Sequence, residues 1–505
     1  MKKIILVILL LSCNKIAKNI DFRNKDINEF LILAIINKET NRVKELIEAG
    51  ANVNYIHNNR SILELSLYKE SLDIVKVLLE KDAKLNKDNI VRIYDLSLED
   101  FRYDVIDLIK DKYKLEEGLI DNNKYFLLLC YISNEEEVKR FIEKNKINPR
   151  DVRDKFSRNG LIISANSNNM EVFRMLVENY KCDINHKNKN GVTPLITASN
   201  VNNKSLMEFI IEKGGKVDDK DDKEWTALMI STLKGYKEIV KLLLEKGSNI
   251  NNKENYGHTA LTIASQNGHK EIVKLLIEKG ANVDDKEGKG WTALMLASQN
   301  GYKEIVELLL EKGANIDNKE NDGYTALMIA SEEGYKEIVE LLLEKGANID
   351  DKEGKGWTSL MLASQNDHKD TVKLLLKKGS NISNKKNDGY TALMIALKRG
   401  SLETLKLLIE RGSNIYDENF SFREIFIHIG ESLKNCKEKS KKNNLIEISY
   451  IIIKKMSEDY INLFISLNKN NANQEIKDEV HNYINILYCL QNLPIELFEE
   501  VIKKF

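Results

Sequence analysis

The sequence is poor in proline, with only three such residues in 505. So few rigid turns favour a chain that is mostly helical. Its charge is also balanced, because 77 Lys and Arg face 78 Asp and Glu. The overall charge therefore gives no attraction to nucleic acid, and we expect no nucleic-acid partner. Hydrophobic residues make up 42% of the chain and charged residues 31%, which is typical of a folded rather than a disordered protein.

Cysteines are few and widely spaced. Besides Cys13, the sequence holds Cys130, Cys182, Cys436 and Cys489, with no C-x-x-C spacing. Cys130 lies in the apolar run "YFLLLCYI" and Cys489 in "NILYCLQN", so both are expected to be small buried residues. The pattern supports neither a disulfide framework nor a zinc site. We expect no metal and no cofactor.

Long apolar runs are scarce as well, and one short run opens the chain. "MKKIILVILLLSCNK" has two lysines, then the apolar residues 4–11, then Ser12 and Cys13. The run is too short to span a bilayer comfortably. The segment resembles a bacterial lipoprotein signal, in which the cysteine is lipidated and becomes the new N-terminus. Leu10 fits that pattern, whereas Leu11 stands where a smaller residue is usual.

This resemblance implies a signal peptide over residues 1–12, a lipidated Cys13 and a tether over residues 13–26. It would place the protein on a membrane, in the periplasm or at the cell surface of a bacterium. An ordinary export signal, an uncleaved anchor and a cytoplasmic chain with an apolar start are the alternatives.

A long internal repeat dominates the rest of the sequence. One threonine recurs every 33 residues, at Thr193, Thr226, Thr259, Thr292, Thr325, Thr358 and Thr391. A glycine keeps the same period, at Gly214, Gly247, Gly280, Gly313, Gly346, Gly379 and Gly412. A 33-residue period with a "TPL" or "TAL" start is typical of ankyrin repeats. "GVTPLITAS" (191–199) and "HKEIVKLLIEKGANVD" (269–284) resemble the two halves of that family's repeat most closely.

The resemblance implies an all-α fold, an ankyrin-repeat solenoid in which each repeat contributes a helix–turn–helix and a hairpin loop. One departure concerns the family's "TPLH", which is mostly "TALM" here. The histidine position is occupied by Met229, Thr262, Met295, Met328, Met361 and Met394. The change removes the hydrogen bonds that the histidine makes in the family, but the position is still expected to lie in the core.

The residues of one copy predict the same helix–turn–helix unit independently of the resemblance to the family. Thr292 is a helix cap, and the short first helix over residues 293–298 ends before Gly301. A second helix is expected over residues 303–312, and Gly313 follows where a left-handed residue is needed. Its apolar face consists of Ile305, Val306, Leu309 and Leu310. One such unit has too little core of its own, so copies must stack.

The array extends beyond the regular copies. Degenerate copies are recognisable over residues 27–190, and regular copies occupy residues 191–420, which gives about twelve repeats. The period is lost after that, and residues 421–505 are expected to form a helical C-terminal cap or a small module.

The sequence holds no recognisable catalytic motif. The repeated carboxylates of the loops follow the period, so we expect them to be solvated surface. His269 and His368 stand at a position that tyrosine fills in other copies, which indicates packing or capping rather than metal binding. The loop at 318–323 faintly resembles a calcium loop, but a lysine inside it and Ile329 at the twelfth position argue against that site.

One column of the repeat is aromatic. The residue before the repeated threonine is, in successive copies, Val192, Trp225, His258, Trp291, Tyr324, Trp357 and Tyr390. In ankyrin proteins this position lies at the base of the hairpin on the concave side, where partners usually bind. Nearby, at the end of the first helix, stand polar pairs such as Gln299–Asn300 and Glu332–Glu333. Tryptophan and tyrosine are enriched at binding hot spots, so the column is a candidate partner-binding surface. The alternative is that recent duplication copied aromatics that only pack against neighbouring hairpins.

Together these features predict a non-enzymatic, monomeric scaffold that binds another protein and is tethered to a membrane outside the cytoplasm. An enzyme or separate functional module in residues 421–505, carried by the array, is one alternative. A structural envelope protein is the other.

Overall fold

The computed structural model describes residues 27–58, 60–100, 102–110 and 117–413, together with residues 446, 447, 449, 451–455 and 457. The chain divides into two compact units, residues 1–222 and 223–505. In the described ranges nearly all regular structure is helical, which confirms the all-α fold class. None of these helices is both long and apolar enough to cross a membrane.

Unit 1 consists of successive helix pairs that grow more regular along the chain. Its helices are α2 (Ile27–Ile36), α3 (Thr40–Glu48), α4 (Ile62–Tyr68), α5 (Leu72–Glu80), α6 (Lys87–Asp100), α7 (Tyr103–Ile106), α8 (Asn122–Ile132), α9 (Glu135–Asn145), α10 (Gly160–Asn166), α11 (Met170–Glu178), α12 (Pro194–Ala198) and α13 (Lys204–Glu212). The strands β1 (Ile56–His57) and β2 (Arg60–Ser61) pair antiparallel between α3 and α4. First helices of successive pairs contact one another from α2 to α12.

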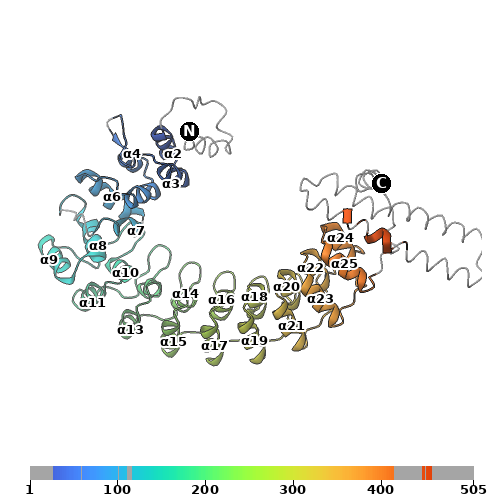
Figure 1. Ribbon diagram of the computed structural model, residues 1–505. Coiled ribbons are helices and arrows are strands. Elements are labelled where there is room, and N and C mark those ends of the chain that lie inside the picture. Colours follow the sequence, from blue (N-terminus) through green and yellow to red (C-terminus); the bar gives the residue numbers. More distant parts are fainter. Residues whose placement is uncertain are drawn as a thin grey trace, which may run out of the picture. The chain divides into compact units, whose positions relative to one another are not determined.

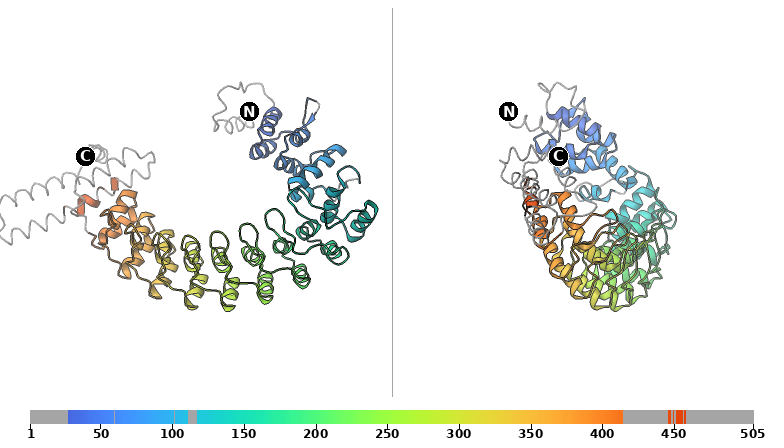
Figure 2. Two further views of the ribbon diagram at one scale, coloured as in Figure 1. Left: turned by 180° about the vertical axis from the view of Figure 1, so that it is seen from behind. Right: turned by 90° about the vertical axis from the view of Figure 1, so that its right-hand side faces the viewer.

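Unit 2 repeats one helix pair with little variation. Its helices are α14 (Ala227–Leu233), α15 (Lys237–Glu245), α16 (Ala260–Gln266), α17 (Lys270–Glu278), α18 (Ala293–Gln299), α19 (Lys303–Glu311), α20 (Ala326–Glu333), α21 (Lys336–Glu344), α22 (Ser359–Gln365), α23 (Lys369–Lys377), α24 (Ala392–Arg399) and α25 (Leu402–Glu410). Within this unit the first helices form one row and the second helices another (Figure 1), and both rows are seen from behind in the left view of Figure 2.

The repeated threonine starts each first helix. In α18, the hydroxyl of Thr292 accepts a hydrogen bond from the N–H of Met295, and Thr292 itself is buried. The same cap recurs at Thr193, Thr226, Thr259, Thr325, Thr358 and Thr391. Because the cap satisfies an N–H that the helix cannot, a helix of only about two turns is stable here. Met295, at the position of the histidine in the family's "TPLH", is buried in the core as expected.

A column of leucines forms the centre of the unit 2 core. These residues lie at one position of successive second helices and are fully buried: Leu243, Leu276, Leu309, Leu342, Leu375 and Leu408. Ile305 and Val306 of α19 are also buried, whereas Leu310 is only half-buried. Since neighbouring second helices contact each other from α15 to α25, each leucine is enclosed by its own copy and the adjacent copies.

Three glycines with positive φ, Gly290, Gly301 and Gly313, allow the chain to turn in the copy of Trp291. Gly313 has φ 86° after α19, the left-handed conformation predicted for a residue that ends a helix. Gly301 also has positive φ, and a side chain there would meet the ring of Tyr335 at 2.9 Å. An aromatic ring thus lies directly on the backbone of the preceding repeat.

Only a few residues of the predicted C-terminal cap or module lie within the described part of the chain. Residues 446, 447, 449, 451–455 and 457 are helical, and Ile452 and Ile453 are buried. Glu447 accepts a hydrogen bond of 2.6 Å from Lys406 of α25. The rest of residues 421–505, like Cys13 and the predicted signal peptide, lies outside the described residues.

Candidate functional site

The aromatic column lies in the loops that precede the first helices of unit 2. Each of its side chains is half-buried, with one part packed and one part facing solvent: Trp225, His258, Trp291, Tyr324, Trp357 and Tyr390. Each stands directly before the buried capping threonine, so the start of the helix fixes its backbone. This partial exposure is compatible with binding a partner and with packing between hairpins.

A glutamate fixes the loop in front of four column residues. One carboxylate oxygen of Glu353 accepts hydrogen bonds from the N–H groups of Lys355 (2.8 Å) and Trp357 (2.9 Å). The N–H of Glu353 in turn donates to the carbonyl of Trp357 at 3.1 Å. The same arrangement recurs at Glu254, Glu287 and Glu320. The column residue is therefore held on a rigid turn.

For three turn glutamates this arrangement corrects the prediction that the loop carboxylates are solvated surface, whereas Asp317 and Asp322 are exposed as predicted. Glu254, Glu320 and Glu353 are buried, and Glu353 is only 6% exposed. Two backbone N–H groups stabilise the charged carboxylate, which compensates for its burial. In unit 1 the side-chain oxygen of Asn188 accepts the equivalent pair of hydrogen bonds, from the N–H groups of Asn190 and Val192.

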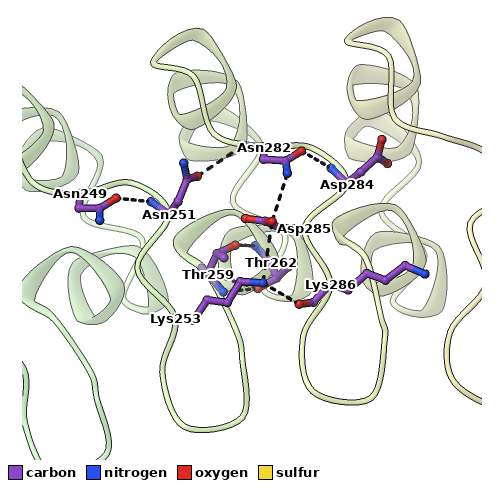
Figure 3. Close-up of polar contacts among 9 residues, drawn as sticks. All are labelled: Asn249, Asn251, Lys253, Thr259, Thr262, Asn282, Asp284, Asp285 and Lys286. Carbon is purple, nitrogen blue, oxygen red and sulfur yellow. Dashed lines mark hydrogen bonds and ion pairs between the residues drawn. The ribbon is translucent and has the colours of Figure 1, made fainter.

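Polar side chains also connect neighbouring loops (Figure 3). Asn251 accepts from the N–H of Asn282 at 3.5 Å, and the ammonium group of Lys253 donates to the carbonyl of Lys286 at 3.0 Å. The next copies repeat both contacts, and there Asp284 accepts from Asn315 at 2.9 Å. Because every loop is bonded to the next one, the column residues keep a fixed spacing along the unit.

The copy around Tyr324 is acidic. Burial and the nearby carboxylates of Glu332, Glu353 and Glu320 raise the pKa of Tyr324 to about 12. Burial also raises the pKa of Glu332, and the charge of Glu333 adds to this shift. Glu332 is half-buried and Glu333 is exposed. A cationic group of a partner would be stabilised here.

In the copy of Trp291 the corresponding pair at the end of the first helix, Gln299 and Asn300, is uncharged. Gln299 is half-buried and Asn300 is exposed. The amide of Asn300 donates to the carbonyl of Leu296 at 2.8 Å, so part of this side chain terminates its own helix. Its amide oxygen is the group that a partner could use.

His269 and His368, at the position that tyrosine fills in other copies, pack against the preceding repeat. His368 lies on Gly334, and its Nε2 is 2.8 Å from the carbonyl oxygen of Glu332. His269 lies on Gly235 in the same way, with Nε2 at 3.2 Å from the carbonyl oxygen of Leu233. Both stand at the start of a second helix, but neither side chain caps it. Packing is therefore their role. The described residues contain no group of His, Cys, Asp and Glu that could hold a metal ion.

The repeat is confirmed by comparison with known families. A family model described as "Ankyrin repeats (3 copies)" matches residues 3–89, 126–221, 195–287, 281–353 and 345–419, which together are most of the chain. No curated protein matches the sequence.

Proposed function

Because the chain belongs to the ankyrin-repeat family, we propose that it is a non-enzymatic scaffold that binds another protein through the aromatic column of unit 2. The observation that carries the proposal is the half-burial of successive aromatic side chains on loops held by Glu254, Glu287, Glu320 and Glu353. Ankyrin repeats are typical of protein-interaction scaffolds, and membership of this family implies that the column lies on the side where partners usually bind.

Rigid aromatic side chains suit this task. A tryptophan offers a large flat surface and one N–H, and it loses little side-chain entropy when a partner covers it. The turn hydrogen bonds have already ordered the backbone of four column residues, so binding does not require these loops to be ordered again.

The test is to remove single tryptophans of the column. Trp291→Ala and Trp357→Ala are each expected to weaken binding of the partner by about 1–3 kcal/mol, because they remove the contact surface. The melting temperature should change little. A pull-down from intact cells with mass spectrometry supplies the partner, and calorimetry then measures the affinity of each variant.

Tyr302→Ala is the matched control, because Tyr302 is also half-buried but packs on Gly268 outside the column. It should lower the melting temperature and leave the affinity of the folded protein unchanged. The proposal fails if the tryptophan variants behave as this control does, losing stability and binding only through unfolding.

We also propose that Cys13 is lipidated and tethers the scaffold to a membrane outside the cytoplasm, in the periplasm or at the cell surface of a bacterium. The support is the sequence alone: two lysines, the apolar run at residues 4–11, and Ser12 before Cys13.

Cys13→Ala is expected to move the protein from the detergent phase to the aqueous phase in a phase-partition experiment, since the lipid chains would be absent. Cys130→Ala, a change at a buried cysteine, is the control and should stay in the detergent phase. A wild-type protein found in the aqueous phase would exclude the lipid anchor.

A further inference from the structure

A hollow of about 350 Å3 opens between the last two aromatic residues of the column. Trp357 and Tyr390 form its walls, and the buried side chain of Ile395 contributes an apolar surface. The remaining lining is charged and comes from the same loop and from the end of α24. It therefore combines an apolar surface with charge in a space large enough for a side chain.

The charge in this hollow differs from that of the preceding copies. Lys386 stands where four copies carry the turn glutamate, so an ammonium group replaces a carboxylate. Its Nζ lies 4.4 Å from the centroid of the Trp357 ring and 5.7 Å from that of Tyr390. The side chain of Lys386 is only 15% exposed, so water screens its charge weakly.

The end of the first helix in this copy also carries more positive charge than in the preceding copy. Lys398 and Arg399 replace the Gln365–Asn366 pair of the preceding copy, and both are exposed beside the hollow. Nζ of Lys398 lies 5.2 Å from the Tyr390 ring centroid. These two substitutions and Lys386 gather three cations around two aromatic rings.

One carboxylate balances part of this charge. Asp388 accepts a hydrogen bond of 2.9 Å from Lys386 and a longer one of 3.4 Å from the N–H of Tyr390. Asp388 thus replaces part of the turn contact that Glu353 makes one copy earlier. The hollow keeps an excess of positive charge.

We propose that this hollow binds a glutamate or aspartate side chain in an acidic peptide segment of the protein partner. The carboxylate would pair with Lys386, Lys398 and Arg399, and a guanidinium group can bind a carboxylate through two parallel hydrogen bonds. The methylene groups and neighbouring apolar residues of the peptide would cover Trp357, Tyr390 and Ile395. A bare phosphate ion would leave those apolar surfaces in water, which favours the peptide.

The inference rests on the proposed function and adds the chemistry of the partner. The acidic copy at Tyr324 lies two repeats earlier and would repel the same segment. Repulsion at Tyr324 and attraction at Lys386 together favour binding of an acidic segment in the hollow between Trp357 and Tyr390.

The experiment uses the full chain and two fluorescein-labelled peptides. In one peptide glutamate alternates with leucine, and in the other glutamine replaces every glutamate. Fluorescence anisotropy should show the glutamate peptide binding at least about 10-fold more tightly, as expected for charge-assisted hydrogen bonds. Lys386→Glu should abolish this preference. Because it restores the glutamate of four other copies, the variant should fold at least as well as the wild type.

The double variant Lys398→Gln with Arg399→Asn restores the pair of the preceding copy and should also weaken the glutamate peptide about 10-fold. The matched control is Lys303→Gln with Lys312→Asn, which removes two exposed lysines of another copy and should not weaken that peptide. Equal binding of the two peptides, or full affinity in Lys386→Glu, overturns the inference.

Two further probes separate the sources of negative charge. Inorganic phosphate, and vesicles of phosphatidylcholine with phosphatidylglycerol, should bind more weakly than the glutamate peptide; tighter binding of either one overturns the inference. Trp291→Ala distinguishes the two proposals. If it leaves partner binding unchanged, the proposed function fails, whereas weakened partner binding with full peptide affinity in Lys386→Glu defeats this inference alone.

Discussion

Replacing Leu309 by alanine is expected to destabilise unit 2 by about 2–5 kcal/mol. Leu309 is fully buried at the centre of the leucine column, so the shorter side chain leaves a cavity between α19 and its neighbours. Because repeats contact only adjacent repeats, the loss should stay local. Hydrogen exchange should show faster exchange over about residues 290–355 than in distant repeats.

Glu307→Ala is the control on the same helix. Glu307 is exposed, so its removal should change stability by less than about 0.5 kcal/mol. Uniform loss of protection from residue 27 to residue 413 in Leu309→Ala would contradict a stack held together by neighbouring contacts.

Glu353→Ala is expected to lower the free energy of unfolding by about 2–4 kcal/mol, because Glu353 is a buried hydrogen-bond acceptor. It removes the acceptor of two backbone hydrogen bonds, and bonds to a charged acceptor contribute about 1.5–3 kcal/mol each before water replaces part of them. Chemical denaturation gives the stability. Hydrogen exchange at the amides of Lys355 and Trp357 should accelerate most.

Glu353→Gln keeps one side-chain oxygen and is the matched control. Asn188 makes the equivalent pair of bonds with an amide, so the glutamine should retain most of the stability. If the alanine variant is as stable as the wild type and the glutamine variant, the side chain of Glu353 does not hold the turn.

Much of the fold followed from the period of the sequence. The threonine that caps a helix, the glycine that ends one and the apolar face of the second helix all act within a single copy. Thr292, Gly313 and Leu309 were therefore predicted in the roles that they have. Leu310 is less buried than predicted: it is half-buried, whereas Leu309 is fully buried.

The buried turn glutamates Glu254, Glu320 and Glu353 show where sequence reasoning failed. A charged residue repeated in a polar loop is usually solvated, and nothing in its identity shows that its side chain turns back onto the backbone. The signal was its fixed place four residues before the column, from Glu254 to His258 and from Glu353 to Trp357. At that spacing one oxygen can reach two N–H groups of the turn.

The candidate site was predictable only as a list of positions. The period put the aromatic side chains in one column, but their half-burial depends on contacts between copies. The contact between the ammonium group of Lys386 and the ring of Trp357 is one such contact, because the two residues belong to successive loops. Only the structure could show that Lys386, Lys398 and Tyr390 lie around one hollow.

The most direct test of the aromatic column uses the intrinsic fluorescence of the protein. All three tryptophans of the chain, Trp225, Trp291 and Trp357, belong to the column, so the indole emission reports on nothing else. In the free protein, acrylamide should quench this emission, and adding the partner should protect it, because the partner covers the exposed faces of the rings. Emission typical of buried indoles in the free protein, with no quenching by acrylamide, would contradict a binding role for the column.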